Sequence, residues 1–165
     1  MTERTLVLIK PDGIFRNLMG KIIGRFEDAG LKIVGMKMVW ADESFAGLHY
    51  KQDIAEKYGK RVRDDLINYV KEGPIVAMVL EGVDAIKVTR KIVGSTYPNE
   101  SLPGTIRGDF AHISKEYANS NQLNVRNLVH ASGNADDAAY EVSLWFTPKE
   151  LHSYKTVHDI ISFAK

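Results

Sequence analysis

The sequence predicts an α+β sandwich, in which helices pack on an antiparallel sheet. Short β-branched and apolar runs, typical of strands, alternate along the chain with amphipathic segments of helical period. The helices fall into two crossovers between few strands, which favours a split βαβ unit over a doubly wound sheet. We therefore expect the α/β (α+β) class with a ferredoxin-like, four-stranded antiparallel sheet. With 165 residues, 44% of them hydrophobic, we expect a single domain spanning 1–165.

The first elements are a strand, a helix and a second strand. Residues 5–9 form a short apolar run that a turn at Asp12-Gly13 stops, which is typical of a buried strand. Asn17 is expected to cap a helix that ends at Gly30. Residues 31–40 then alternate like a long strand with one mainly apolar face.

The middle of the chain predicts two helices, a third strand and a further helix. Residues 42–58 and 62–71 have helical character, and a glycine follows the first of these segments. Residues 74–81 are almost wholly apolar and predict a strand. Residues 83–93 predict the helix that follows, and it ends at Gly94.

The last third of the chain is less regular. Residues 95–108 are rich in Pro, Gly, Ser and Thr without periodicity, which marks a loop that is either ordered and functional or disordered. Residues 111–113 are the candidate for the fourth strand, and residues 117–122 are polar and irregular. Residues 136–144 predict a helix, and a tail with a short helix follows Pro148.

Composition excludes several classes of protein. Lys and Arg total 22 against 21 Asp and Glu, so no global basic field favours specific nucleic-acid binding. The absence of cysteine excludes disulfides, thiol catalysis and thiolate metal sites. No apolar run is long enough for a membrane span, and residues 6–9 are too few for a secretion signal. We therefore expect a soluble cytoplasmic protein.

One histidine has the surroundings of a reactive group. His130 follows Asn127 by three residues and precedes Ser132 by two, with Leu128 and Val129 available to bury the backbone. A held imidazole suits group transfer or proton transfer because it titrates near neutral pH and carries a nucleophilic nitrogen. The alternative is a histidine with a structural role only.

A carboxylate and three cations could serve that histidine. Glu141 lies in the predicted helix after it and could fix the tautomer of the imidazole, its alternative role being that of a surface charge. Lys10 follows a buried strand, Arg90 lies on the helix before the loop, and Arg107 stands between glycines. Together these cations could neutralise one polyphosphate, whereas each taken singly fits an ordinary ion-paired charge equally well.

Neither a metal cage nor a common nucleotide-binding loop is predicted. The phosphate-cradling Gly-x-x-x-x-Gly-Lys loop and the Gly-x-Gly-x-x-Gly turn are both missing from the sequence. The remaining histidines have no ligand-like spacing with one another or with carboxylates, so we assign no metal site to them. These histidines are His49, His112, His152 and His158.

Four segments together resemble the nucleoside diphosphate kinases, in that family's order. They are residues 5–13, residues 103–110, the Asn127-x-x-His130-Ala131-Ser132 block and residues 141–146. The likeness covers nearly the whole chain, and the Thr-Ile-Arg-Gly-Asp-Phe and Asn-x-x-His blocks are the most diagnostic.

The resemblance implies a ping-pong kinase that moves the γ-phosphoryl of a nucleoside triphosphate, typically ATP, to a nucleoside diphosphate and so maintains NTP and dNTP pools. It implies that His130 is phosphorylated, that Glu141 orients it, and that Ser132 and Tyr50 lie nearby. Mg²⁺ would arrive with the nucleotide rather than on protein ligands. The implied nucleotide contacts are Lys10, Arg90, Thr96, Arg107 and Asn127, with Val62 nearest to the family's base-stacking aromatic residue. A homo-oligomer, with the hexamer preferred, is implied by the same analogy.

The chain departs from the family pattern in three places. Gly133 stands where the family usually has Asp, and the segments near 58–63 and 111–125 are longer than usual. Gly133 and the altered segment near 58–63 motivate a second hypothesis, a nucleotide- or partner-binding module with weak catalysis on the same fold. None of them removes the expected nucleophile.

Overall fold

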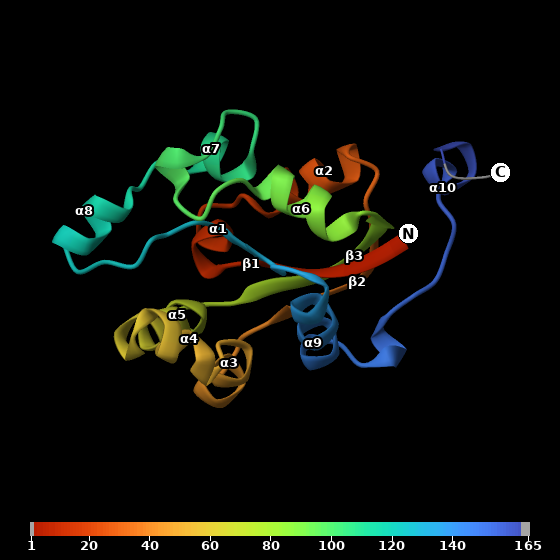
Figure 1. Ribbon diagram of the computed structural model, residues 1–165. Coiled ribbons are helices and arrows are strands. Elements are labelled where there is room, and N and C mark those ends of the chain that lie inside the picture. The colour runs from red at the N-terminus through yellow and green to blue at the C-terminus, as the bar shows by residue number, and fades with distance from the viewer. Residues whose placement is uncertain (1, 163–165) are drawn as a thin grey trace.

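The computed structural model describes residues 2–162, and its sheet has the predicted architecture. The strands are β1 (Thr2–Ile9), β2 (Lys32–Val39), β3 (Ile75–Val83) and β4 (Val129–Ala131). They pair antiparallel in the order β2-β3-β1-β4 (Figure 1). This confirms the predicted α+β fold with a four-stranded antiparallel sheet.

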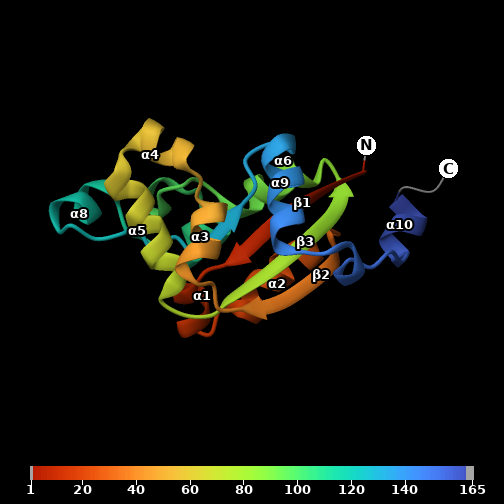
Figure 2. The ribbon, with the colours of Figure 1, turned by 90° about the horizontal axis from the view of Figure 1, so that it is seen from below.

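Helices cover both faces of the sheet, as Figures 1 and 2 show. One face carries α1 (Pro11–Phe15), α2 (Met19–Asp28), α6 (Ala85–Val93) and α7 (Ile106–Phe110). The other face carries α3 (Glu43–His49), α4 (Gln52–Tyr58), α5 (Lys60–Lys71) and α9 (Ala135–Trp145). α8 (Lys115–Ser120) and α10 (Val157–Ser162) lie at opposite ends of the molecule. Single 3₁₀ turns, η1 (Pro98–Glu100) and η2 (Pro148–Glu150), complete the described chain.

β1 lies at the centre of two hydrophobic cores. Val7 and Ile9 pack into the core beneath α2 and α6, and Leu6 and Leu8 pack into the core on the opposite face. Because successive side chains of a strand point to opposite faces, a strand covered on both sides must be apolar throughout. This requirement explains the uninterrupted apolar run at the end of β1.

The prediction of the fourth strand is wrong. Residues 111–113 form no strand, and the fourth strand is β4, whose three residues pair with Val7–Ile9 along the free edge of β1. Three paired residues are too few for a strand period to be visible in the sequence. The consequence is functional, because His130 occupies the middle of β4, opposite Leu8.

The predicted helix over residues 42–58 is two helices. Asp42 caps α3 by accepting a hydrogen bond from Phe45 N, and α3 ends at His49 because the next residue, Tyr50, has φ −94° and ψ 82°, which are not helical. α4 then begins after Lys51, which is extended. The break matters because it leaves Tyr50 at a corner rather than on a helix face. The next helix, α5, begins two residues before the predicted residue 62.

Three local predictions near helix ends are corrected. The turn predicted at Asp12-Gly13 is part of the short helix α1, with Pro11 at its first position, where a missing N–H costs nothing. Asn17 caps nothing; it has φ 55° in the turn before α2, whose N-cap is Leu18. The segment expected to be irregular holds α8, which Ser114 caps by accepting from Tyr117 N. A polar helix of six residues gives no apolar period to detect.

β2 also departs from simple alternation. Its pairing with β3 shifts between Ile33 and Gly35, which inserts one extra residue into β2. Since side chains alternate along a strand, the shift moves the following residues to the other face. Met36 and Met38 therefore lie 55% and 57% exposed on the edge strand, so the predicted apolar face is only partly buried.

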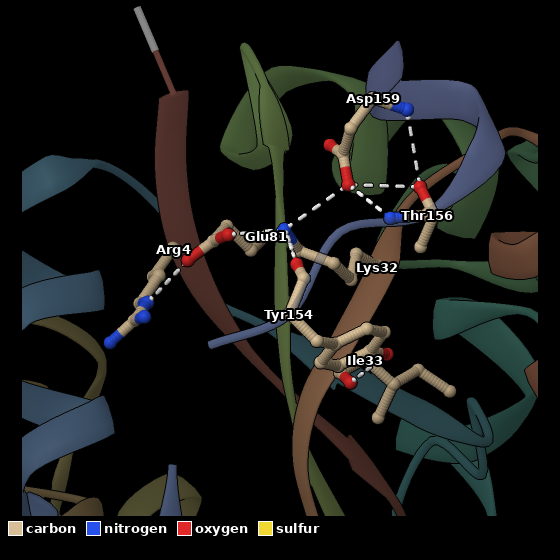
Figure 3. A network of polar contacts seen from close by, with 7 residues as sticks. All are labelled: Arg4, Lys32, Ile33, Glu81, Tyr154, Thr156 and Asp159. Atoms are coloured by element: carbon tan, nitrogen blue, oxygen red, sulfur yellow. Dashed lines mark hydrogen bonds and ion pairs between the residues drawn. The ribbon is translucent and has the colours of Figure 1, made fainter. Parts of the chain in front are cut away.

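The C-terminal segment is fastened to the edge of the sheet by a polar network (Figure 3). Lys32 Nζ contacts Glu81 Oε1 at 2.8 Å and Asp159 Oδ2 at 3.4 Å, and it donates to Tyr154 O at 2.9 Å. Glu81 Oε2 accepts from Arg4 Nε at 2.8 Å. The positive charge of Lys32 is therefore balanced by two carboxylates, those of Glu81 and Asp159.

We expect Lys32→Met to loosen this segment. The variant removes the side chain that joins Glu81 of β3 to Asp159 of α10, so amide exchange in residues 154–161 should accelerate at least tenfold. The free energy of global unfolding should fall by only about 1 kcal/mol, because Glu81 retains its ion pair with Arg4 and these ion pairs are partly exposed to solvent. Hydrogen exchange by mass spectrometry measures both effects, with Lys21→Met on α2 as the control. Unchanged exchange in this segment would contradict the fastening role.

Candidate active site

A cavity of about 620 Å³ opens where the ends of several elements meet. Its lining comes from the end of β1, the α3–α4 corner, the C-terminal end of α6, and β4 with the start of α9. Eight predicted site residues lie on this lining, namely Lys10, Tyr50, Arg90, Thr96, Arg107, Asn127, His130 and Glu141. Two others, Ser132 and Val62, do not.

His130 is held by Glu141 through one ring nitrogen. Its Nε2 lies 3.0 Å from both carboxylate oxygens, and Glu141 Oε2 also accepts from Ser132 Oγ at 2.6 Å. Burial alone would raise the pKa of Glu141, but His130 and the hydrogen bonds from His130 and Ser132 lower it to about 2. Glu141 is therefore an anion at neutral pH, and Nδ1 of His130 is the nitrogen that no residue among 2–162 engages.

The backbone on either side of β4 fixes His130. Leu128 is fully buried with φ 68°, and its N–H donates to Asp12 Oδ2 at 3.2 Å while its carbonyl accepts from Lys10 N at 2.8 Å. A left-handed leucine is strained, so it persists only where neighbours hold it in place. Beyond His130, Ser132 Oγ accepts from Leu6 N at 3.2 Å. Ser132 thus ties the strand and orients the carboxylate from behind.

Lys10 begins a chain of polar contacts along the cavity wall. Its Nζ donates to Asn127 Oδ1 at 2.8 Å, and Asn127 Nδ2 donates to Thr96 O at 2.9 Å. Burial, reinforced by the positive charge of Arg107, lowers the pKa of Lys10 to about 7. At neutral pH a large fraction of Lys10 is therefore uncharged, and this fraction can take up a proton when an anion binds beside it.

Binding of a phosphate-bearing ligand, such as the nucleotides that the sequence resemblance implies, should therefore take up a proton. Phosphate oxygens beside Lys10 favour its charged form, so its pKa rises on binding and affinity falls above pH 7, by at most tenfold per pH unit. Calorimetry with ADP at pH 8, in buffers of different ionisation enthalpy, should show an uptake close to one proton that disappears below pH 6.

The lysine itself is tested by two variants in the same experiment. Lys10→Met should abolish the proton uptake, and Lys91→Met, an exposed lysine of α6 outside the cavity lining, should retain it. The assignment fails if Lys10→Met takes up as many protons as the unaltered protein.

Arg107 is more a structural cation than a free anion ligand. Four of its five N–H groups donate to the backbone carbonyls of Asn127, Gly94, Ser95 and Val129, at 2.6–3.1 Å. Burial lowers its pKa to about 10, so it remains charged at neutral pH. Arg107 joins the end of α6 to β4 and leaves one N–H of Nη2 for a ligand. The exposed Arg90 lies on the same lining without such ties.

The structure adds lining residues that the sequence reasoning missed. Tyr58 and Leu66 line the cavity, whereas Val62, on the same α4–α5 segment, is 42% exposed outside that lining. His49, next to Tyr50, is 5% exposed and packs against His130 with ring centroids 4.6 Å apart. The adjacency of His49 to Tyr50 was the available signal. Lys51, Lys57 and Tyr140 also line the cavity.

One group of side chains in residues 2–162 has the composition and spacing of a metal site. His49, His130 and Glu141 each offer a ligand atom, and these atoms lie within 4.8 Å of one another. The Nδ1 atom of His49 accepts a hydrogen bond from Trp145 Nε1 at 3.2 Å, so the neutral ring keeps its proton on Nε2. Neither nitrogen of His49 then has a lone pair for a cation, and we assign no metal to this group.

Comparison with known proteins decides the family. The family model described as "Nucleoside diphosphate kinase" matches residues 3–151. The chain belongs to the nucleoside diphosphate kinase family. It is 42% identical over 156 residues to the nucleoside diphosphate kinase of Borreliella burgdorferi, covering 94% of this chain and 93% of that protein. It is 46% identical to the Pyrococcus horikoshii kinase, covering 96% and 94% of the two chains.

Solved structures of nucleoside diphosphate kinases match over the same extent. A Borrelia burgdorferi kinase described as a transition state mimic with bound vanadate and ADP aligns with a TM-score of 0.94 at 41% identity, covering 96% and 95% of the chains. A Halobacterium salinarum kinase in complex with CDP aligns with a TM-score of 0.82 at 37% identity, covering 96% and 97%. This chain is thus a nucleoside diphosphate kinase, which transfers phosphate between nucleotides. No helix within residues 2–162 is long and apolar enough to cross a membrane.

Proposed function

We propose that this kinase works by a ping-pong mechanism through a phosphohistidine at His130. The observation that carries the proposal is the contact of Nε2 with both oxygens of Glu141, at 3.0 Å, on a histidine that lines the cavity. A carboxylate on Nε2 fixes the tautomer that leaves a lone pair on Nδ1, and this nitrogen is the nucleophile.

The two half-reactions exchange one phosphoryl group. In the first, the Nδ1–phosphorus bond forms as the bond from the γ-phosphorus to the bridging oxygen breaks, and the nucleoside diphosphate leaves with that electron pair. In the second, a β-phosphate oxygen of another nucleoside diphosphate attacks the phosphohistidine, and Nδ1 recovers its lone pair. Ionised Glu141 offsets the charge that the imidazole gains between the two steps.

The phosphates are bound by cations that the fold holds in place. Lys10 and the free N–H of Arg107 lie within the cavity wall, and Arg90 lies on its lining. Phosphoryl transfer depends on positioning and positive charge, which this arrangement supplies. Mg²⁺ enters as part of the substrate, bridging the nucleotide phosphates. Thr96 and Asn127 also line the cavity, and Tyr50 packs against His49, which in turn packs against His130.

The relatives support both the phosphoryl site and a broad tolerance of bases. The Borrelia structure is described as holding vanadate and ADP as a transition state mimic, and the Halobacterium structure holds CDP. One purine and one pyrimidine nucleotide thus bind close relatives. In this chain Tyr58 and Leu66 offer the apolar contact for the base, and the contribution of Val62 stays a prediction.

The departure at Gly133 does not favour the weakly catalytic alternative. Asn134 caps α9 by accepting from Asp137 N at 2.9 Å, so the helix that carries Glu141 keeps its N-cap.

Initial rates with ATP and a second nucleoside diphosphate should give parallel double-reciprocal lines. Intersecting lines, or binding without turnover, would reject the ping-pong proposal.

We further propose that residues 1–165 form one kinase domain, located in the cytoplasm, that assembles as a homo-oligomer with the hexamer preferred. Met36 and Met38 support the assembly, because they expose apolar area on β2, a strand at the edge of the sheet. Sedimentation velocity at micromolar concentration should give a species several times the mass of the 18.5 kDa chain, and a monomer would contradict the assembly.

A further inference from the structure

Two imidazoles stand beside one carboxylate in this active site. The rings of His49 and His130 meet at 82° with centroids 4.6 Å apart, and each offers a nitrogen within 4.8 Å of a Glu141 oxygen. Glu141 carries a single negative charge in a largely buried place, so it can offset only one imidazolium at a time. The catalytic step requires the Glu141 carboxylate to stabilise positive charge on His130. This requires that His49 stay uncharged.

The neighbour on the far side of His49 supplies the discrimination. Trp145, 2% exposed, directs its indole Nε1 at His49 Nδ1 at 3.2 Å. An indole N–H can only donate, so Nδ1 must accept and cannot carry a proton. Protonating His49 would place two N–H groups against each other in a buried contact, which costs the hydrogen bond and adds a repulsion.

The groups around His49 act in the same direction. The pKa of His49 is lowered to about 3, chiefly by burial and in addition by positive charges on His130 of β4, Lys10 after β1 and Lys51 after α3. Glu141 of α9 alone raises it. Tyr50 also packs against the ring, with centroids 4.7 Å apart, and its pKa is raised by burial, so it remains neutral.

We propose that Trp145 is a positioning residue that acts through His49: its indole N–H keeps the His49 ring neutral with the proton on Nε2, and so reserves the negative charge of Glu141 for His130. The inference rests on the proposed function, because it takes His130 as the nucleophile. As the Nδ1–phosphorus bond forms and the bridging oxygen departs with its electron pair, the imidazole of His130 becomes positive. A neutral His49 neither repels that charge nor competes for the carboxylate.

The tautomer can be observed without any turnover. Long-range ¹H–¹⁵N spectra of the full-length protein should assign the His49 proton to Nε2 and show no titration of this ring from pH 8 down to pH 5. In Trp145→Phe, which keeps an aromatic ring but lacks the donor, His49 should titrate at a clearly higher pH. A proton on Nδ1 of His49 in the unaltered protein would overturn the inference.

Rapid-quench measurements of phosphoenzyme formation provide the kinetic test. The rate of Trp145→Phe divided by that of the unaltered protein should fall at least twofold between pH 8 and pH 5, because the variant loses the indole donor that opposes a proton on His49, while burial still keeps the pKa of this ring below that of a free imidazole. A packing defect would lower the rate by the same factor at every pH. Trp40→Phe, at an exposed tryptophan outside the cavity lining, is the control, and its rate ratio should not change with pH.

A double variant separates the proton from the packing. His49→Gln combined with Trp145→Phe cannot gain a proton at position 49, so the additional acid sensitivity should disappear even if the plateau rate is lower. A ratio for Trp145→Phe that is constant with pH would overturn the inference while phosphoenzyme still forms. Absence of any phosphoenzyme in the unaltered protein would instead overturn the proposed function, and the spectra would still decide the tautomer.

Discussion

Replacing His130 with alanine is expected to lower the rate of phosphate transfer by a factor on the order of 10⁴ or more. The variant removes the nucleophile. Among the described residues, the other nucleophilic side chain that hydrogen-bonds Glu141 is that of Ser132, and it cannot take the place of His130. Ser132 is fully buried behind the carboxylate and does not line the cavity. Direct transfer between bound nucleotides is not an alternative in a ping-pong cycle, because the two occupy the site in turn.

The fold should survive the same change. His130 pairs with Leu8 through the backbone, and its side chain is 21% exposed, so the free energy of unfolding should change by about 1 kcal/mol. A coupled assay of ATP consumption with a nucleoside diphosphate measures turnover, and chemical denaturation measures stability. His112→Ala, at an exposed histidine outside the lining, is the matched control. Turnover within tenfold of the unaltered protein would disprove the assignment of the nucleophile.

Arg107→Ala is expected to have the largest effect on stability, a loss of about 3–5 kcal/mol in the free energy of unfolding. The guanidinium satisfies four backbone carbonyls that lie at the end of α6, in the following loop and in the segment directly before His130. Removing it leaves polar oxygens without donors at a place where water has little access. The same change should reduce nucleotide affinity, because the loop that carries Thr96 loses its anchor.

The effect of Arg107 can be separated from loss of positive charge. Arg90→Ala removes a cation from the same lining, but Arg90 is exposed and has no such set of carbonyl contacts. It should weaken ADP binding while changing the free energy of unfolding by less than about 0.5 kcal/mol. Urea denaturation of the two variants, followed by tryptophan fluorescence, makes the comparison. Equal stabilities would show that the carbonyl contacts of Arg107 contribute little.

The sequence was most informative where burial and period are strong. The apolar run of β1, the helix at α2 and the run of β3 could be identified because two covered faces or one covered stripe impose a visible pattern. β4 could not, since its three residues gain their structure from pairing with β1. The break at Tyr50 was also invisible, because a non-helical tyrosine ends α3 without Gly or Pro.

The site divides in a similar way. His130, Glu141 and the cations were predicted because chemistry demands those residue types and the family motif groups them. Ser132 was placed near the histidine, but its position behind Glu141 emerges only from the pairing of β4 with β1. The contact of His49 with Trp145 joins residues 96 apart in sequence, on α3 and α9, and no local pattern predicts it.

The most direct test of the central claim is the stoichiometry of phosphorylation with γ-labelled ATP and Mg²⁺. We expect one acid-labile, alkali-stable label per chain, absent from His130→Ala and discharged by diphosphates of both purine and pyrimidine nucleosides. Binding of ATP without any label, or a label that persists in His130→Ala, would contradict a phosphohistidine at His130.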